Sequence, residues 1–203
     1  MKKNINLLKF GMYILSLWLL FILIIVNKIN IEICLSCDFS NKQEIINILK
    51  NNILPLSCIF LLSISFAFYL YFKNLINGAK NGPFEIVEIE DKSSEHLVFL
   101  ATYVIPLVGF SLEGIRQIIN LYITLVILGA IYIRTNLFYA NPTLSLLGFK
   151  IFSAKIIIDN NEKWVILIAR EDFEVKDGIN TYKLDKKIFF AKKTLRVTSN
   201  EIN

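Results

Sequence analysis

The sequence has few of the residues with which enzymes bind metals or activate nucleophiles. It contains one histidine, His96, and three cysteines, so a histidine-rich metal site or a Ser-His-Asp triad would lack most of its members. The eight glycines are dispersed, and neither GxGxxG nor GxxxxGKS/T, the two common phosphate-binding patterns, occurs. The sequence therefore predicts no enzymatic activity and no cofactor.

Charged residues are also scarce through most of the first two thirds of the chain, and long apolar runs take their place. Four runs cover residues 10–26, 53–72, 97–112 and 118–133. Each is close to the roughly 20 residues that a helix needs to cross a bilayer, and the apolar content of 55% is high for a soluble domain of 203 residues. No small-residue cleavage pattern follows the first run, which favours an uncleaved helix over a signal peptide. The sequence predicts a mainly α membrane protein with four transmembrane helices in residues 1–141.

From Pro142 onward the pattern changes to short apolar stretches between lysines. Three stretches are typical of strands, with a turn before the third: residues 149–158, 163–170 and 183–193, and Asp177-Gly178 at the turn. None of them is long enough to span a membrane. We expect residues 142–203 to form a small, basic, β-rich cytoplasmic domain built on an antiparallel sheet.

The positions of lysine and arginine predict the orientation of the helices. Lys2, Lys3 and Lys9 lie at the start of the chain, whereas the connection between the third and fourth runs carries only Arg116. Because cytoplasmic connections are rich in lysine and arginine, the N-terminus is expected in the cytoplasm. Four crossings return the C-terminus to the same side, and the basic tail agrees with that side. The sequence thus predicts a multi-pass membrane protein with both termini in the cytoplasm.

Two cysteines lie in the predicted extracytoplasmic connection between the first two runs. Cys34 and Cys37 form a CxxC pattern in a compartment where thiols oxidise, so a local disulfide is one interpretation and free thiols are the other. A thioredoxin-like catalytic role would require a βαβ context, which the surrounding sequence lacks.

The third run contains residues that bend helices, and a polar turn follows it. Pro106 and Gly109 lie in this run, where a proline frees a carbonyl and kinks the helix, so a hinge is one interpretation and a static kink the other. Glu113 and Arg116 are three residues apart and are placed to pair. The turn is either the polar tip of a helical hairpin or a sensing or permeation element inside the bilayer, which the cost of buried charge disfavours.

Two clusters of opposite charge lie on the predicted cytoplasmic side. The acidic cluster, between the second and third runs, comprises Glu85, Glu88, Glu90 and Asp91, and the basic cluster, near the C-terminus, comprises Lys186, Lys187, Lys192 and Lys193. The acidic cluster is a candidate docking surface for a protein partner, and the lysines would contact membrane lipid, a protein partner or only water. Direct binding of nucleic acid is not expected, because Phe189 and Phe190 are the only local aromatic residues that could stack on bases.

Two segments are similar to a known family. They are SEHLVFLATYVIPLVGFSLEG at residues 94–114 and NLFYANPTLSLLGFKIFSAKI at residues 136–156. Together with four predicted spans and a small basic tail, they resemble the KwaA family, the membrane subunit of the Kiwa antiphage defence system of bacteria. The two segments cover about a fifth of the chain and contain no catalytic signature.

The resemblance implies a function that composition and spacing do not show. It implies a homo-oligomer, specifically a tetramer, that lies in the bacterial inner membrane and senses perturbation of the cell envelope during phage infection. It also implies a cytoplasmic effector, KwaB, which binds DNA and blocks phage replication and late transcription. A sensor and scaffold fits a chain without catalytic residues. The alternative is a small oligomeric pore or transporter, which is disfavoured because the first, second and fourth runs contain no ionisable residue.

Overall fold

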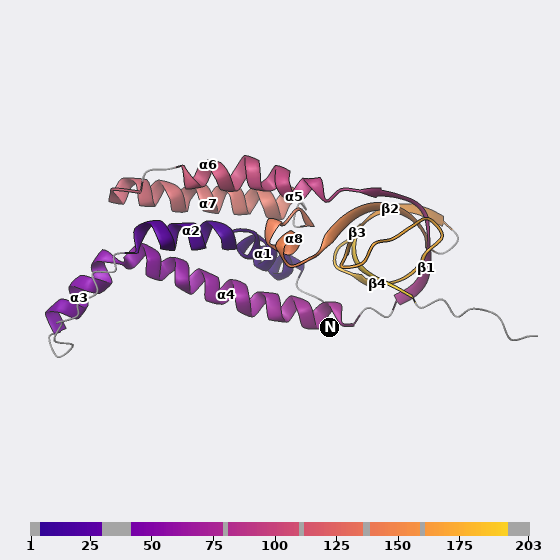
Figure 1. The fold of residues 1–203 in the computed structure, drawn as a ribbon, viewed down its shortest axis with the longest axis horizontal. Helices are drawn as coiled ribbons and strands as arrows, with labels where there is room; N and C mark the ends of the chain where they lie inside the picture. The colour runs from indigo at the N-terminus through magenta and orange to yellow at the C-terminus, as the bar shows by residue number, and fades with distance from the viewer. Residues whose placement is uncertain are drawn as a thin grey trace, which may run out of the picture.

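The computed structural model describes residues 5–29, 42–78, 81–109, 112–135, 139–158 and 161–194. Helices form one end of an elongated molecule and a β-barrel forms the other (Figure 1). The helical elements are α1 (Ile5–Ser16), α2 (Trp18–Lys28), α3 (Lys42–Asn51), α4 (Ile53–Ile76), α5 (Ser94–Phe99), the π-helical turn η1 (Leu100–Val104), α6 (Ile105–Val108), α7 (Ile115–Thr135) and α8 (Pro142–Leu146). The strands are β1 (Asn81–Asp91), β2 (Lys150–Ile158), β3 (Asn161–Ala169), β4 (Gly178–Lys183) and β5 (Ile188–Lys193).

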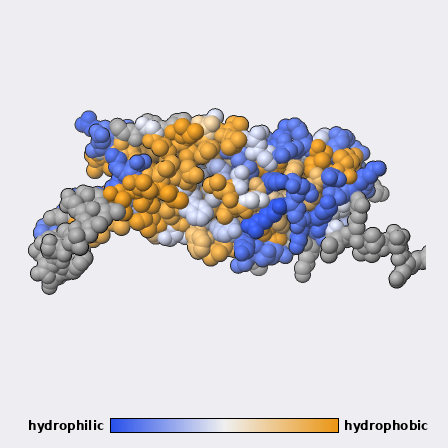
Figure 2. All heavy atoms as spheres, viewed as in Figure 1, coloured by the Kyte–Doolittle hydropathy of each residue, from blue (hydrophilic) through white to orange (hydrophobic). Residues whose placement is uncertain are grey.

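Two of the described helices, α4 and α7, are each long and apolar enough to cross a membrane. They contain 24 and 21 residues, which at 1.5 Å per residue gives about 36 and 32 Å, against a hydrocarbon core of about 30 Å. Only 22% of the apolar window of each helix is buried inside the protein. Figure 2 shows hydrophobic side chains gathered over the helical end and hydrophilic ones over the barrel. The outer surface of these helices therefore suits lipid.

The first predicted transmembrane helix is broken into α1 and α2, which are bent by 41°. The break falls at Leu17, whose φ of −92° and ψ of 4° lie outside the α-helical region. Its N–H donates to the carbonyl of Ile14, three residues back, at 3.2 Å, and the Ser16 hydroxyl donates to the carbonyl of Tyr13 at 2.7 Å. The bent pair provides a further span only if both halves cross the membrane as one element.

The third predicted transmembrane helix is too short. Helical structure runs through α5, η1 and α6 from Ser94 to Val108, about 22 Å at the usual rise. Pro106 has no N–H to donate, and directly before it the N–H of Ile105 donates to the carbonyl of Leu100, five residues back, which is the π-helical pattern. The structure thus supports two spans, or three with the bent pair, and the prediction of four transmembrane helices is wrong.

The five strands close into a barrel in the order β1-β2-β3-β5-β4. The pair β3 and β5 is parallel, and the other four neighbouring pairs are antiparallel. This is the connectivity of the OB fold, a five-stranded Greek-key barrel. The interior is filled by a cluster of apolar side chains: Ile86, Phe152, Ala154, Ile156, Val165, Leu167, Ala169, Phe173, Ile179, Phe189 and Ala191.

The β-rich region was predicted in part. Strands β2 and β3 and the turn before Gly178 are confirmed. The separate antiparallel domain after the helices is wrong, because the barrel contains a parallel pair and because β1 comes from the acidic connection that follows α4. In β1 the apolar side chains of Ile86 and Ile89 point inward while the glutamates between and beside them are exposed. The segment 183–193 is the end of β4, a turn and β5 rather than one strand.

Aromatic side chains attach the barrel to the end of α4. The ring of Phe149 lies between those of Phe72, at 6.0 Å, and Phe190, at 6.4 Å. The guanidinium of Arg170 lies 4.3 Å from the centroid of the Phe149 ring and donates to the hydroxyl of Tyr69 on α4 at 3.3 Å. Edge-on rings and a cation over a ring are favourable geometries, so the helices and the barrel share one apolar core.

Candidate functional site

A buried ion pair joins the first helix to the barrel. The ammonium of Lys9 on α1 lies 3.0 Å from a carboxylate oxygen of Asp185 in the β4–β5 turn, and the side chains are only 11% and 9% exposed. The second carboxylate oxygen of Asp185 accepts the N–H of Lys186 at 2.8 Å. Two charges with this little solvent are tolerated only when they compensate one another. The pair therefore fixes where α1 meets the barrel.

Two side chains from the segment after α7 hold the bend between α1 and α2. The amide of Asn141 donates to the carbonyl of Met12 at 3.0 Å, and the hydroxyl of Thr143 donates to the carbonyl of Leu15 at 2.7 Å. Asn141 also caps α8, because its side-chain oxygen accepts the N–H groups of Thr143 and Leu144. Asn141 is fully buried. The last turn of α1 is thus bound by residues more than 120 positions away in the chain.

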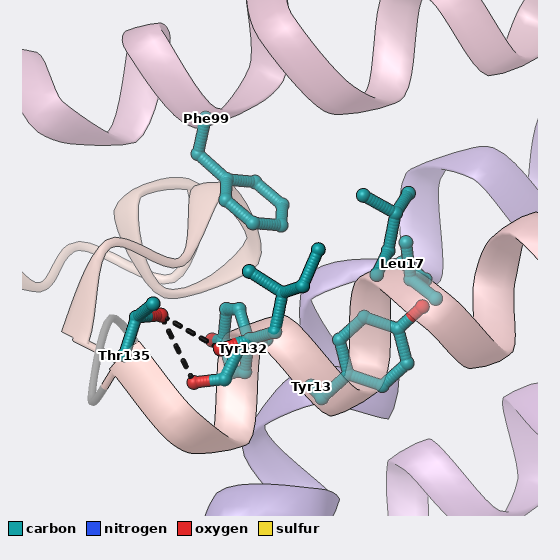
Figure 3. Close-up of a pocket in the computed structure, with 7 residues that line it drawn as sticks. Tyr13, Leu17, Phe99, Tyr132 and Thr135 are labelled. Atoms are coloured by element: carbon teal, nitrogen blue, oxygen red, sulfur yellow. Dashed lines mark hydrogen bonds between the residues drawn. The ribbon is translucent and has the colours of Figure 1, made fainter.

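Aromatic side chains pack α1 against α7 just beyond these contacts (Figure 3). The ring centroids of Tyr13 and Tyr132 are 5.4 Å apart, and the Tyr132 ring meets the Phe99 ring edge-on with a centroid distance of 5.6 Å. The hydroxyl of Tyr13 donates to the carbonyl of Leu125 at 2.5 Å. Gly129 makes room for Tyr13, since a Cβ there would lie 2.8 Å from the ring. The apolar cavity that remains has a volume of about 20 Å³, which is enough for about one water molecule, so these residues pack rather than bind a ligand.

The single histidine lies where α5 meets α8. His96 is 1% exposed. Its ring nitrogens lie close to the backbone of Phe149 and Asn141, yet neither makes a hydrogen bond of normal geometry to the described residues. Burial lowers the pKa of His96 to about 4, and the two backbone groups oppose this shift only in part. His96 is therefore neutral at pH 7.

The acidic cluster lies on β1, where its members are exposed and partly paired within the chain. Glu88 pairs with Lys155 at 3.0 Å, and Glu90 pairs with Lys92 at 2.6 Å. Hydrogen bonds from the side chain and the N–H of Ser93 lower the pKa of Asp91. Glu85 lies where β1 pairs with β4, opposite Gly178. The structure thus assigns a folding role to a segment that was predicted to be a docking connection.

The basic cluster is divided between two places on the barrel. Lys186 and Lys187 lie in the β4–β5 turn, and Lys192 and Lys193 lie on β5. Lys193 pairs with the largely buried Asp177 at 2.8 Å. The four lysines therefore do not form one patch. Binding of a partner or of lipid by either cluster stays a prediction.

The predicted hairpin residues lie at the far end of the helices from the barrel. Glu113 and Arg116 are exposed, and in the part of the chain that the structure describes no ion pair joins them. Pro106 follows the π-helical turn, and the N–H of Gly109 donates to the carbonyl of Ile105 at 3.3 Å. The hinge stays a prediction.

Two further predictions concern cysteines and metals. Cys34 and Cys37 lie outside the described residues, so the disulfide stays a prediction. Within the described ranges, no group of three or more His, Cys, Asp or Glu side chains is arranged to hold a metal ion. The contacts of Lys9, Asn141 and Thr143 were not predicted, because a sequence does not show which distant groups meet.

Comparison with known proteins identifies the family. The family model described as "Anti-phage protein KwaA" matches residues 8–190. The chain is also 34% identical over 191 residues to "Kiwa protein KwaA" of Escherichia coli O55:H7 (strain RM12579 / EPEC), a match that covers 92% of this chain and 96% of that protein. No solved structure matches the chain.

Proposed function

Because this chain belongs to the KwaA family of anti-phage proteins, we propose that it acts in phage defence as a membrane-embedded sensor and scaffold. In this proposal, perturbation of the cell envelope during infection changes the arrangement of the membrane helices. The barrel passes the change to a cytoplasmic effector, and the protein itself carries out no reaction.

The contacts of α1 support this proposal most directly. Lys9 is bound to the barrel through Asp185, and the bend at the end of α1 is bound by Asn141 and Thr143. Buried polar contacts have defined geometry and are costly to separate. A movement of α1 or α2 in the membrane would therefore move the barrel instead of being absorbed by a flexible connection, and discrete contacts of this kind suit a two-state switch.

The proposed orientation places the barrel and both chain ends in the cytoplasm of a bacterium, below the inner membrane. The structure supports a common side for the barrel, α1 and the end of α4, since Lys9 of α1 and Phe72 of α4 both contact the barrel region. The basic start of the chain indicates the cytoplasmic side. Alkaline phosphatase fused at Asn203 is expected to be inactive, and an active fusion would contradict this orientation.

We also propose the partners that the family resemblance implies. The related E. coli protein is named for a Kiwa system, and a system has other components. The proposed assembly is a homotetramer in lipid, with KwaB as the cytoplasmic effector. Exposed faces of α4 and α7 leave room for contacts between copies as well as with lipid.

The test of the sensor proposal is phage protection by variants that cut the α1 contacts. Lys9→Met keeps the length of the side chain but removes its charge, and we expect protection to fall while membrane insertion and the homo-oligomer persist. Lys150→Met is the matched control, because Lys150 pairs with Asp172 on the surface, where the side chains are 44% and 74% exposed. Full protection by Lys9→Met, with KwaB still co-purifying, would contradict the proposal. Steady ion conductance of the purified protein in planar bilayers would point to a pore instead.

A further inference from the structure

A large cavity opens at one end of the barrel, where β2 and β4 end and where β1, β3 and β5 begin. Its volume is about 610 Å³, within the range of ligand-binding pockets. The lining residues are Asn81, Phe84, Ile158, Lys163, Trp164, Val165, Thr181, Lys183, Lys186, Lys187 and Phe189. We call it the barrel-mouth cavity.

The barrel-mouth cavity is strongly basic. Four lysines line it, and none of the lining residues is acidic. Across the described residues, Lys163, Lys186 and Lys187 make no ion pair, whereas Lys155 on the barrel wall is held between Glu88, at 3.0 Å, and Glu162, at 2.7 Å. Lysines such as these three, which line a concave surface and make no ion pair, attract phosphate groups.

Aromatic side chains lie among these lysines. Trp164 is 49% exposed and lines the cavity together with Lys163, Phe84 and Phe189. Its side chain lies on the face of β3 opposite to that of Lys163, across from Lys155 of β2. An exposed indole beside lysines is the arrangement on which unpaired bases stack while their phosphates are neutralised. The sequence alone indicated only Phe189 and Phe190. Phe190 instead packs against Phe149 at the helices, and Trp164 and Phe84 come from strands distant in sequence.

The connectivity of the barrel agrees with this chemistry. OB-fold barrels bind oligonucleotides and oligosaccharides on the face of strands 2 and 3 and with the loop between strands 4 and 5. The barrel-mouth cavity takes its walls from the end of β2, the start of β3 and the β4–β5 turn. Connectivity by itself does not establish a function, but here the basic and aromatic side chains occupy the corresponding places.

We propose that the barrel-mouth cavity binds single-stranded nucleic acid, with the lysines on the phosphates and Trp164 stacked on a base. A lipid headgroup is the competing occupant, because Lys186 and Lys187 also line a cavity beside Lys9 and Thr135 near the ends of α1 and α7. A headgroup would use the lysines but has no flat base to cover Trp164. The exposed indole therefore favours nucleic acid.

The test uses the full-length protein in nanodiscs of zwitterionic lipid and a fluorescein-labelled oligomer of twelve thymidines, followed by fluorescence anisotropy. If Lys163, Lys186 and Lys187 each neutralise one phosphate, the logarithmic salt slope is about −2.1, and affinity falls roughly 20-fold between 50 and 200 mM salt. We expect Lys163→Glu with Lys187→Glu to abolish binding. Lys176→Glu with Lys192→Glu, which changes the net charge equally outside the cavity, should leave most of it.

A second pair of variants separates stacking from charge. Trp164→Ala should weaken binding at least tenfold, and Trp164→Phe should restore most of it because a ring remains to stack on the base. Thermal unfolding of each variant checks that the fold persists, and Trp164→Phe together with the lysine pairs keeps the test decisive if Trp164→Ala fails to fold. The proposal is overturned if the oligomer does not bind, or if both lysine pairs weaken binding equally. It is also overturned if Trp164 fluorescence responds to phosphatidylglycerol in the nanodisc and not to the oligomer, because the occupant is then a headgroup.

Discussion

Removal of the buried ion pair between α1 and the barrel should destabilise the protein far more than removal of a surface pair. At the 3.0 Å separation of Lys9 and Asp185, the Coulomb attraction is about 5.5 kcal/mol with an effective dielectric constant of 20, and desolvation offsets much of it. Lys9→Ala leaves the Asp185 carboxylate buried without its cation. Truncation of one partner of a buried pair costs about 3–5 kcal/mol.

A double-mutant cycle in detergent isolates the coupling within this pair. The free energy of unfolding is measured for Lys9→Ala, for Asp185→Ala and for the double variant, and the double variant should lose clearly less than the sum of the two single losses. Lys150→Ala is the control, since its partner Asp172 is largely exposed and a surface pair contributes about 0–1 kcal/mol.

Attachment of α1 to the barrel by charge is refuted if the two single losses add within about 0.5 kcal/mol in the double variant, the margin seen for independent sites. It is also refuted if Lys9→Ala costs no more than Lys150→Ala. Either result would show that α1 is held to the barrel by apolar packing and not by charge.

Three further predictions concern buried positions among α1, α5, α7 and α8. Asn141→Ala removes the donor to Met12 and the cap of α8, so chemical unfolding should show a loss of about 2–4 kcal/mol, whereas Asn141→Ser, which keeps a neutral capping oxygen, should lose less. Gly129→Ala places a Cβ 2.8 Å from the ring of Tyr13 and should cost about 1–3 kcal/mol by overpacking; an unchanged melting temperature would show that Tyr13 moves freely. The pKa of His96 is lowered to about 4, so the unfolded state binds the extra proton between pH 6.5 and pH 4. Stability should fall through that window by up to about 3 kcal/mol and level off below it, and His96→Gln should remove this component from the difference between pH 7 and pH 4.

The helices that follow from a single apolar run in the sequence were predictable. The shape of the helices that bond to residues far away in the chain was not. α4 and α7 follow from the long apolar runs at residues 53–72 and 118–133. Hydrogen bonds from Asn141 and Thr143, more than 120 residues away, accompany the break at Leu17. No residue in the first apolar run indicates these bonds. Pro106 did predict an irregular helix, and the π-helical turn lies directly before it.

The barrel shows the same division between local and distant information. β2 and β3 were found because they are adjacent strands joined by a polar turn. β1 was not predicted because its glutamates indicated a charged connection. Ile86 and Ile89 nevertheless form the inward face of a strand. Closure of the barrel depends on the pairing of Asn81 with Thr181, which no local pattern specifies.

Lys9 and Lys186 illustrate why the candidate sites were only partly predictable. Each was recognised as a basic residue, and Lys9 served to orient the chain. The buried pairing of Lys9 with Asp185 and the cavity that Lys186 shares with Trp164 exist only in the folded chain. The positions of lysines in a sequence do not show which lysine is buried in an ion pair and which one lines a cavity.

The insertion of α5 to α8 between β1 and β2 has a consequence for biogenesis. β1 leaves the ribosome early, but its partners β2 and β4 follow only after the segment that contains α7 has been made. Until then β1 presents an unpaired edge, which is a site for aggregation and proteolysis. The barrel can close only after the intervening helices have been synthesised, so a chain that stalls within this segment keeps an open strand edge that quality-control proteases would recognise.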